Sequence, residues 1–491
     1  MSRCKFAAAY AALVASTLAG CGAIGSYSHD AFNDNIEADR ASNQQILLNI
    51  LRARERRPLE LTSLRQVTVT STLQGQFGLS APLREFGGTT ALTATPQVTV
   101  SRQPQVQDDI LDTQEFYNGF LKPIPMQTVD LYLNQGYPPA FFYHLLLRTI
   151  TVSQGAHSFV ASNAIGDPQS DSGSFRQLVE AFLDARLVTE PITEKSNVGP
   201  PLKPQEVKER LREIVAADKE KLTLEHDKKK NEYQLQRSEK SYRFCLQSAL
   251  ERAGPGSTQA KDPDLQRLVT LALGLRCGAS AKQRDEMVAT LDRDSGKEGG
   301  AVEREFTLGS RKMIRKACGA AQLDAGFAPD FKEYLTRYCD LDSDLREITG
   351  IGSDDDASLA LRMTTKSTEA VLYYLGEAAR RSISTPAAGV LIPVAPKESA
   401  EEQQPLCGKA WGKHETRRYA CRPLLVIETG DSATAPFVST EYEGNKYWIP
   451  STRDKAGLSL QAFEVFHQLF ALNKSGKDLP ATTILTVTGI P

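Results

Sequence analysis

The stretch VTVTSTLQGQFGLS, which runs from Val67 to Ser80, alternates between two classes of side chain. Its odd-numbered positions read Val, Val, Ser, Leu, Gly, Phe and Leu, whereas its even-numbered positions are Thr, Gln, Gly or Ser. Successive side chains of a β-strand point to opposite faces, so a period of two predicts a strand with one apolar and one polar face. The predicted strand is long, since strands of globular proteins usually have about 5–6 residues.

A second alternating segment, Leu92–Val100, follows a region that is rich in turn-forming residues. Both segments are uncharged, and together they predict one long β-hairpin over 67–100. Two interpretations remain open. A half-buried hairpin in a globular sheet alternates in the same way as a membrane-spanning hairpin, whose strands need about 9–11 residues. Pro96 counts against complete pairing of the second strand.

A single hairpin has open edges and cannot enclose a pore, so the membrane-spanning interpretation requires several copies that each contribute a hairpin. In outline, such an arrangement resembles that of lipoproteins of the curli-secretion type. The resemblance implies a homo-oligomeric outer-membrane pore built from the 67–100 hairpin as one alternative function.

The rest of the chain mixes helical and strand patterns. Apolar residues at helical spacing predict helices at Phe175–Ala185 and Leu458–Leu472, while Ala140–Val152 predicts a core helix that passes into a strand. The predicted fold class is α+β, with an α/β body from the N- and C-terminal parts and a disulfide-stapled helical insertion. The predicted parts are a signal peptide at 1–20, an N-terminal α/β part with the hairpin at 21–200, the helical insertion at 205–345 and a C-terminal α/β part at 360–491.

The insertion opens with Gln205–Leu250, which is rich in charged residues and contains no Gly or Pro. Leu211, Leu222, Tyr233 and Phe244 recur every 11 residues, a period that fits a nearly straight helical packing seam. The segment therefore predicts one long helix with a solvated, charged face.

Six cysteines remain after those at positions 4 and 21 are set aside. An even number in an exported protein indicates disulfides, although six cysteines allow 15 pairings. We favour neighbouring pairs, because each pair brackets a break at which the chain could fold back. No CxxC motif occurs, and the cysteines fit no common zinc pattern, so no metal site is expected. The favoured pairs are Cys245–Cys277, Cys318–Cys339 and Cys407–Cys421.

The first residues have the pattern of an export signal. Arg3 and Lys5 precede an apolar run, Phe6–Leu18, that is too short to cross a bilayer as a helix of about 20 residues. The tetrapeptide Leu18–Cys21 resembles the lipobox of bacterial lipoproteins. That resemblance implies cleavage before Cys21, acylation of this cysteine and anchoring in a membrane, since two or three acyl chains anchor stably. An ordinary signal peptide with an incidental cysteine is the alternative.

No aspartate follows Cys21, and by resemblance to the enterobacterial sorting pattern this favours the outer membrane, with the body facing the periplasm. Three short motifs also resemble a group of uncharacterised proteobacterial lipoproteins. This likeness implies a related fold and no mechanism. The motifs are Asn49–Arg54, Tyr373–Glu377 and Tyr447–Pro450.

Two charged clusters allow more than one interpretation. Arg52, Arg54, Arg56 and Arg57 end a predicted helix at 35–56, where they either complement the negative end of the helix or contact lipid phosphates. The run Asp340-Leu-Asp-Ser-Asp344 has the oxygen spacing of a calcium loop, but it lacks the glycine and glutamate that an EF-hand needs. We therefore expect it to be a loop that caps a helix beginning near Asp344.

Composition and motifs exclude several classes of function. The chain carries 58 basic and 60 acidic side chains, and this balance does not point to nucleic acid. No HExxH, GxSxG, phosphate-binding or dinucleotide-binding motif occurs, so we expect no catalytic residue and no cofactor. The leading hypothesis is a lipid-anchored lipoprotein of the outer membrane or periplasm with a non-enzymatic binding, scaffolding or envelope-assembly role. It would bind the membrane through Cys21 and associate with an envelope protein or with itself. A periplasmic enzyme with a dispersed site is a further alternative, for which His144 or His157 would need a carboxylate partner in a pocket.

Overall fold

The structure is a computed structural model of the 491-residue chain. For 62–80 and 93–110 it describes the backbone alone. The chain divides into two compact units: unit 1 comprises Met1–Phe120, Ile427–Ala456 and Phe463–Pro491, and unit 2 comprises Leu121–Val426 and Gly457–Ala462. The described residues are 36, 38–80, 93–110, 113–165, 172–209, 222–227, 231–247, 263–295, 306–323, 327–351, 358–384, 389–396, 406–407, 419–431 and 435–473.

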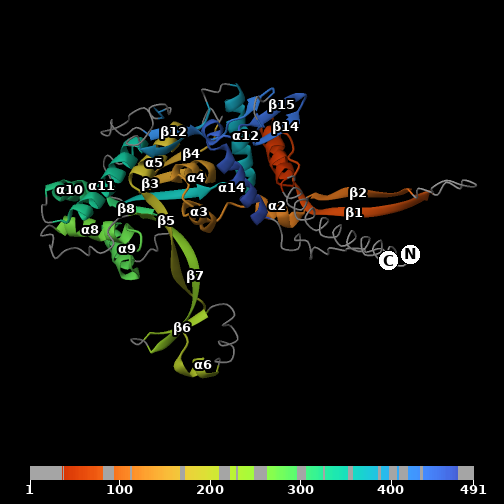
Figure 1. The fold of residues 1–491 in the computed structure, drawn as a ribbon. Helices are drawn as coiled ribbons and strands as arrows, with labels where there is room; N and C mark the ends of the chain where they lie inside the picture. The colour runs from red at the N-terminus through yellow and green to blue at the C-terminus, as the bar shows by residue number, and fades with distance from the viewer. Residues whose placement is uncertain are drawn as a thin grey trace, which may run out of the picture. The chain divides into compact units, whose positions relative to one another are not determined.

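Both units mix helices with antiparallel sheets, so the α+β class is confirmed (Figure 1). Unit 1 combines segments from both ends of the chain, as predicted for the body. The boundary, however, follows Phe120 and not residue 200. Residues 121–200 therefore belong to the same unit as the helices of the expected insertion. No described helix has both the length and the apolar content needed to cross a membrane.

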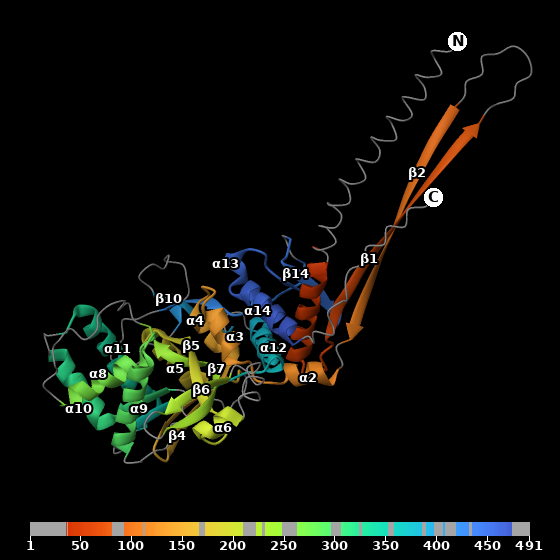
Figure 2. The ribbon, with the colours of Figure 1, turned by 90° about the horizontal axis from the view of Figure 1, so that it is seen from below.

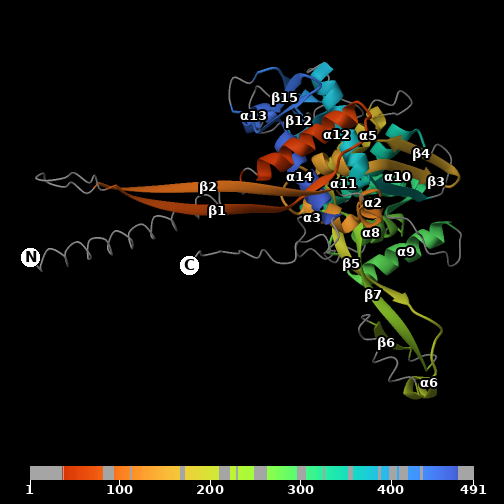
Figure 3. The ribbon, with the colours of Figure 1, turned by 90° about the vertical axis from the view of Figure 1, so that its right-hand side faces the viewer.

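The hairpin of unit 1 has the predicted form. Strands β1 (Thr62–Ser80) and β2 (Thr93–Ile110) pair in antiparallel register from Thr62↔Ile110 to Ser80↔Thr93, with one irregularity near Leu64 (Figure 3). The pairing continues through Pro96, which lies opposite Phe77. Among the described strands, β1 and β2 form a sheet of their own, so the larger sheet expected for a globular hairpin is not seen in this part of the chain.

The rest of unit 1 combines the helix at 38–54 and α2 with elements from the C-terminal part. The C-terminal elements are the sheet in the order β13–β15–β14, α13 and the last part of α14, which begins in unit 2. Phe116 and Phe120 of α2 stack and meet the edge of Phe470 from α14. The bounds are α2 (Gln114–Phe120), β13 (Glu428–Thr429), β14 (Val438–Tyr442), β15 (Asn445–Ile449), α13 (Arg453–Ala456) and α14 (Ser459–Leu472).

The arginine cluster at the end of the 38–54 helix contacts the β14–β15 hairpin. Arg54 donates from Nη2 to the Tyr447 hydroxyl at 3.3 Å, and its guanidinium lies 5.1 Å from the centre of that ring. Arg57 forms an ion pair with Glu443, a residue of the tight β14–β15 turn. Both central residues of this turn, Glu443 and Gly444, have positive φ, as a two-residue hairpin loop requires. At least two of these arginines thus bind protein groups.

Unit 2 is built around a four-stranded antiparallel sheet in the order β4–β3–β9–β8. The expected helix-to-strand passage at Ala140–Val152 is confirmed, since α4 passes directly into β3. Helices α4 and α5 contact this sheet, and α11 packs on α5 (Figure 1). The bounds are α3 (Met126–Leu133), α4 (Pro139–Leu146), β3 (Leu147–Gln154), β4 (His157–Ser162), α5 (Ser172–Asp184), β8 (Phe306–Ser310), β9 (Ser358–Thr365) and α12 (Thr368–Ser384).

The long helix predicted for Gln205–Leu250 is wrong. After the short α6 (Pro204–Glu209), the described residues form β6 (Leu222–Asp227) and β7 (Glu232–Leu246), which pair with each other. Along its whole length β5 (Leu187–Asn197) also pairs with β7. Backbone pairing with a distant strand thus overrides local helix propensity. The β5–β7 ribbon leads to β6 and α6 at its far end (Figure 1).

Among the described helices of unit 2, α8 packs against α9 and α10, and α10 packs against α11 (Figure 2). Two disulfides staple this region, Cys245–Cys277 and Cys318–Cys339, as expected. A further sheet, β10–β12–β11, contains Cys421, which is also disulfide-bonded, while the side chain of its expected partner Cys407 lies outside the described residues. The bounds are α8 (Pro263–Leu275), α9 (Ala281–Ser295), α10 (Arg311–Leu323), α11 (Pro329–Thr349), β10 (Leu391–Pro396), β11 (Leu406–Cys407) and β12 (Tyr419–Pro423).

Candidate functional site

The register of the β1–β2 hairpin places apolar residues of both strands on one face, because residues directly opposite one another in a ladder share a face. From Gln66 to Ser80, beyond the irregularity near Leu64, the odd-numbered residues of β1 lie opposite the even-numbered residues of β2. The exception to apolar pairing is Ser71↔Arg102. The other pairs on this face are Val67↔Val106, Val69↔Pro104, Leu73↔Val100, Gly75↔Val98, Phe77↔Pro96 and Leu79↔Ala94.

The other face of the hairpin is polar and uncharged over the same length, with pairs such as Thr70↔Gln103, Gln74↔Thr99 and Gln76↔Gln97. Beyond Arg102, toward the turn, neither β1 nor β2 carries a charge. A two-stranded ribbon is marginally stable by itself in water. An amphipathic ribbon of this length therefore needs a surface that covers its apolar face, and its two open edges are free to pair with further strands.

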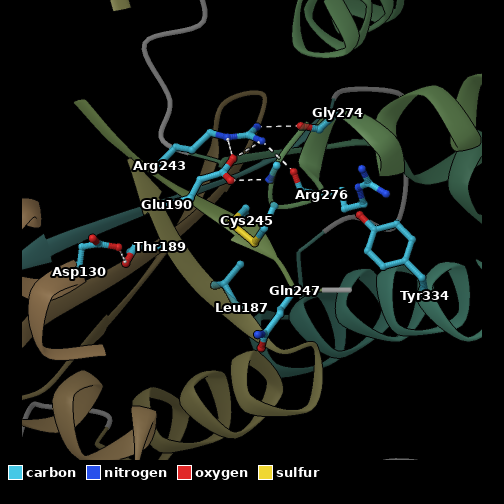
Figure 4. Close-up of a disulfide and its surroundings, with 12 residues drawn as sticks. Asp130, Leu187, Thr189, Glu190, Arg243, Cys245, Gln247, Gly274, Arg276 and Tyr334 are labelled. Carbon is cyan, nitrogen blue, oxygen red and sulfur yellow. Dashed lines mark hydrogen bonds and ion pairs between the residues drawn. A yellow bond between two sulfur atoms is a disulfide. The ribbon is translucent and has the colours of Figure 1, made fainter. Parts of the chain in front are cut away.

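The Cys245–Cys277 disulfide lies beside a half-buried ion pair (Figure 4). Arg243 of β7 donates from Nε to Glu190 Oε1 of β5 at 2.7 Å. Its Nη1 and Nη2 atoms donate to the carbonyl oxygens of Gly274 and Arg276 at 2.7 and 2.9 Å. These carbonyls stand at the end of α8, where backbone acceptors lose their helical partners. The disulfide and Arg243 together fasten α8 to the β5–β7 ribbon.

Glu190 and the two cysteine sulfurs lie within 4.8 Å of one another, a spacing that could hold a metal ion. Both sulfurs, however, are used by the disulfide, and metal ligands must be thiolates. Glu190 also accepts a hydrogen bond from the Gly278 amide and neutralises Arg243. We therefore interpret this cluster as a structural junction.

Replacing Cys245 and Cys277 together by serine should lower the free energy of unfolding by about 4 kcal/mol. The residues are 32 positions apart, and this value follows from the loop entropy that the disulfide removes from the unfolded chain. Urea denaturation of the variant and the parent would measure the loss. The Cys318–Cys339 disulfide closes a shorter loop, so the double variant Cys318→Ser/Cys339→Ser should lose slightly less free energy of unfolding. An unchanged midpoint for the first variant would contradict the assignment.

The end of α4 is held by buried side chains that the sequence did not indicate. Lys366, which follows β9, donates from Nζ to the carbonyl oxygens of His144 and Leu145 at 2.8 and 3.3 Å. Its Nζ also lies 3.8 Å from the centre of the Tyr374 ring, as in a cation–π contact. Asn163 donates from Nδ2 to the His144 and Leu147 carbonyls at 2.6 and 2.8 Å. Burial lowers the pKa of Lys366 well below its usual value.

Replacing Asn163 by alanine should destabilise the protein by about 2–3 kcal/mol, because two hydrogen bonds to buried carbonyls are lost. Thermal or urea denaturation would measure this difference. The matched control is Ser158→Ala on the same edge of the sheet, since Ser158 is exposed on β4 and its replacement should change stability little. Equal stability of both variants would show that the Asn163 contacts contribute nothing.

The two histidines considered for a dispersed site, His144 and His157, lie in different environments. His144 is buried in α4 against the edge of Phe175, as expected for a core residue. Burial lowers its pKa to about 3, with the cations of Lys366 and Arg176 adding to the effect. A general base needs a pKa near the working pH, and a carboxylate usually orients it. His157 is exposed at the start of β4, and His226 stacks on Tyr233 in the β6–β7 hairpin.

The loop expected at Asp340–Asp344 is wrong, because these residues lie inside α11. Inside a helix the carboxylates cannot take the loop conformation that surrounds the ion of an EF-hand. Asp342 instead accepts a hydrogen bond from Arg346 Nε at 2.9 Å, one turn further along the helix. Helix α11 ends at Gly350, whose positive φ suits a helix terminus.

The chain has no significant similarity to a protein family, to a curated protein or to a solved structure. The resemblances described above rest on short motifs, among them Leu18–Cys21 and Tyr447–Pro450. Cys21 lies outside the described residues. Function is therefore inferred from the chemistry of this chain's own residues.

Proposed function

We propose that this protein is a lipid-anchored component of the bacterial outer membrane or periplasm with a non-enzymatic role in binding or envelope assembly. The anchor is the acylated Cys21, and the hairpin β1–β2 is the element through which copies of the chain associate at the membrane. The observation that carries the proposal is the hairpin's register, which gathers apolar residues of both strands on one face. Association of several copies would cover the apolar face of the hairpin and pair the open edges of its two strands.

The export signal supports this proposal from a second direction. Arg3, Lys5 and the apolar run to Leu18 lead directly to Cys21, the residue that lipidation modifies. Disulfides persist in oxidising compartments outside the cytosol, and the described residues of unit 2 include the pairs Cys245–Cys277 and Cys318–Cys339 as well as the disulfide-bonded Cys421. Anchoring at Cys21 would hold unit 1, which contains the hairpin, at the membrane surface.

A homo-oligomeric pore is the second candidate function. Toward the turn from Arg102, β1 and β2 alternate without a charged residue over lengths that suit a tilted membrane-spanning strand of about 9–11 residues. In such an assembly the face with Phe77 and Leu79 would meet lipid, and the face with Gln74 and Gln76 would meet water. The two candidates share the anchor and differ in whether the hairpin lies on the membrane or crosses it.

Replacing Cys21 by alanine tests the anchor. The parent protein expressed in a bacterial host should incorporate radiolabelled palmitate and sediment with the membranes, because two or three acyl chains anchor stably. The alanine variant should lose the label and appear mainly in the released fraction. Replacement of Cys4, which lies within the predicted signal peptide, is the matched control and should retain the label. A parent protein without label would refute the lipoprotein assignment.

A further inference from the structure

A cleft of about 650 Å³ opens in unit 2 along α10 and α11. The Cys318–Cys339 disulfide joins the two helices and forms part of the cleft wall. The end of α11 and the two residues after its last turn close one side. The disulfide therefore links the two helices that line the cleft, and none of the lining residues belongs to the hairpin or the anchor.

Charges of both signs line this cleft. Three arginines and four carboxylates line a space wide enough for a small organic molecule. Arg315 and Glu347 are exposed, whereas Asp342 and Arg346 are buried. The charged lining residues are Arg311, Arg315, Arg346, Asp340, Asp342, Asp344 and Glu347.

Two buried polar atoms of this wall have no hydrogen-bond partner. Asp342 and Arg346 are 4% and 8% exposed. Arg346 Nε donates to Asp342 Oδ2 at 2.9 Å, and its Nη1 donates to Gln154 Oε1 of β3 at 3.3 Å. This arrangement leaves Asp342 Oδ1 and Arg346 Nη2 without a partner. Buried polar atoms in proteins are almost always satisfied, so an acceptor and a donor on neighbouring side chains indicate a missing group.

The charges of Asp342 and Arg346 are only partly matched within the pair. Burial raises the pKa of Asp342, while Arg346 and Arg311 lower it by favouring the carboxylate. Arginine–carboxylate pairs are frequently bidentate. Here Asp342 Oδ1, an acceptor, and Arg346 Nη2, a donor, have no partner. An ammonium group would donate to the first, and a carboxylate would accept from the second.

We propose that the α10–α11 cleft binds a short zwitterionic peptide, with its carboxylate near the arginines and its ammonium near the aspartates. Asp342 and Arg346 are the buried contacts of the cleft lining. Arg315 and Glu347 at the exposed rim attract the two ends of the peptide. A neutral molecule gains none of these charge-assisted contacts, so the cleft discriminates by charge pattern.

Calorimetric titration of the mature, detergent-solubilised chain with the dipeptide Asp-Lys tests this proposal. The neutral probe is Ala-Ala with an acetylated N-terminus and an amidated C-terminus. We expect saturable binding of Asp-Lys and none of the capped probe. The variants Arg315→Gln and Glu347→Gln should each weaken Asp-Lys about fivefold, the effect of an exposed ion pair worth about 1 kcal/mol. These two positions are exposed, so the variants should fold.

The matched control is Lys312→Gln, since Lys312 is an exposed residue of α10 that does not line the cleft. It should leave the affinity unchanged. Three results would overturn the proposal: no saturable binding of Asp-Lys at millimolar concentration, equal binding of the capped probe, or equal loss of affinity in the Lys312 variant. The first result would mean that an internal water satisfies Asp342 and Arg346. None of these results depends on the anchor or on the state of assembly.

Discussion

Replacing His144 by phenylalanine should make the protein markedly less sensitive to acid. Burial holds the pKa of His144 at about 3, against 6.5 for the exposed side chain. Between pH 6.5 and pH 3, His144 therefore binds a proton in the unfolded chain but not in the folded chain. The free energy of unfolding falls as the pH drops through this range. The full difference corresponds to about 5 kcal/mol, at about 1.4 kcal/mol per pH unit. The phenylalanine variant lacks this contribution.

Urea denaturation of both proteins at several pH values would measure the effect. Relative to its own value at pH 7, the parent should lose about 3 kcal/mol more than the variant by pH 4.5. Phenylalanine keeps an aromatic ring beside Phe175, so the packing of α4 is largely retained. His157→Phe is the control, because His157 is exposed at the start of β4. Parallel pH profiles for parent and His144 variant would contradict the buried, neutral state of this histidine.

Placing a charge on the apolar face of the hairpin should abolish assembly of the protein. Phe77 lies opposite Pro96 on that face. An aspartate there would enter lipid or an apolar contact without a partner, which costs several kcal/mol per copy. Because every copy in a ring would carry the charge, we expect Phe77→Asp to shift the protein from the assembled form to single copies. Size-exclusion chromatography in mild detergent would measure the shift.

Gln76→Asp is the matched control for this experiment. Gln76 is the preceding residue and lies opposite Gln97 on the polar face of the same ribbon. The same charge is introduced one residue away, but it faces water or polar groups, and assembly should persist. If Phe77→Asp assembles as well as Gln76→Asp, the apolar face is not an assembly surface.

The elements that were predicted correctly carry their signal within one segment. The alternation at Val67–Ser80 corresponds to β1, and the apolar stripe at Phe175–Ala185 corresponds to α5. The helix prediction for Gln205–Leu250 was wrong because β7 is defined by its pairing with β5, from Leu187↔Leu246 to Asn197↔Gln236. One local signal was missed: Asn231 has positive φ in the β6–β7 turn, a conformation that asparagine tolerates.

The disulfides could be predicted from the sequence, whereas the buried polar contacts could not. The neighbouring disulfides Cys245–Cys277 and Cys318–Cys339 were predictable, because each closes a short loop around a break in the chain. The contacts of Lys366 could not be predicted, since its acceptors at the end of α4 lie more than 200 residues away in sequence. Arg346 likewise meets Gln154 across 192 residues of sequence. Buried polar partners of this kind are set by the assembled sheet and leave no local pattern.

The native mass of the protein in mild detergent tests the central claim most directly. Multi-angle light scattering would give the mass of the protein component, with 53.8 kDa as the mass of one full-length chain. Association through β1–β2 predicts a discrete assembly of several copies, and a closed ring of that kind would support the pore. A single copy over a wide range of concentration would contradict association through the hairpin.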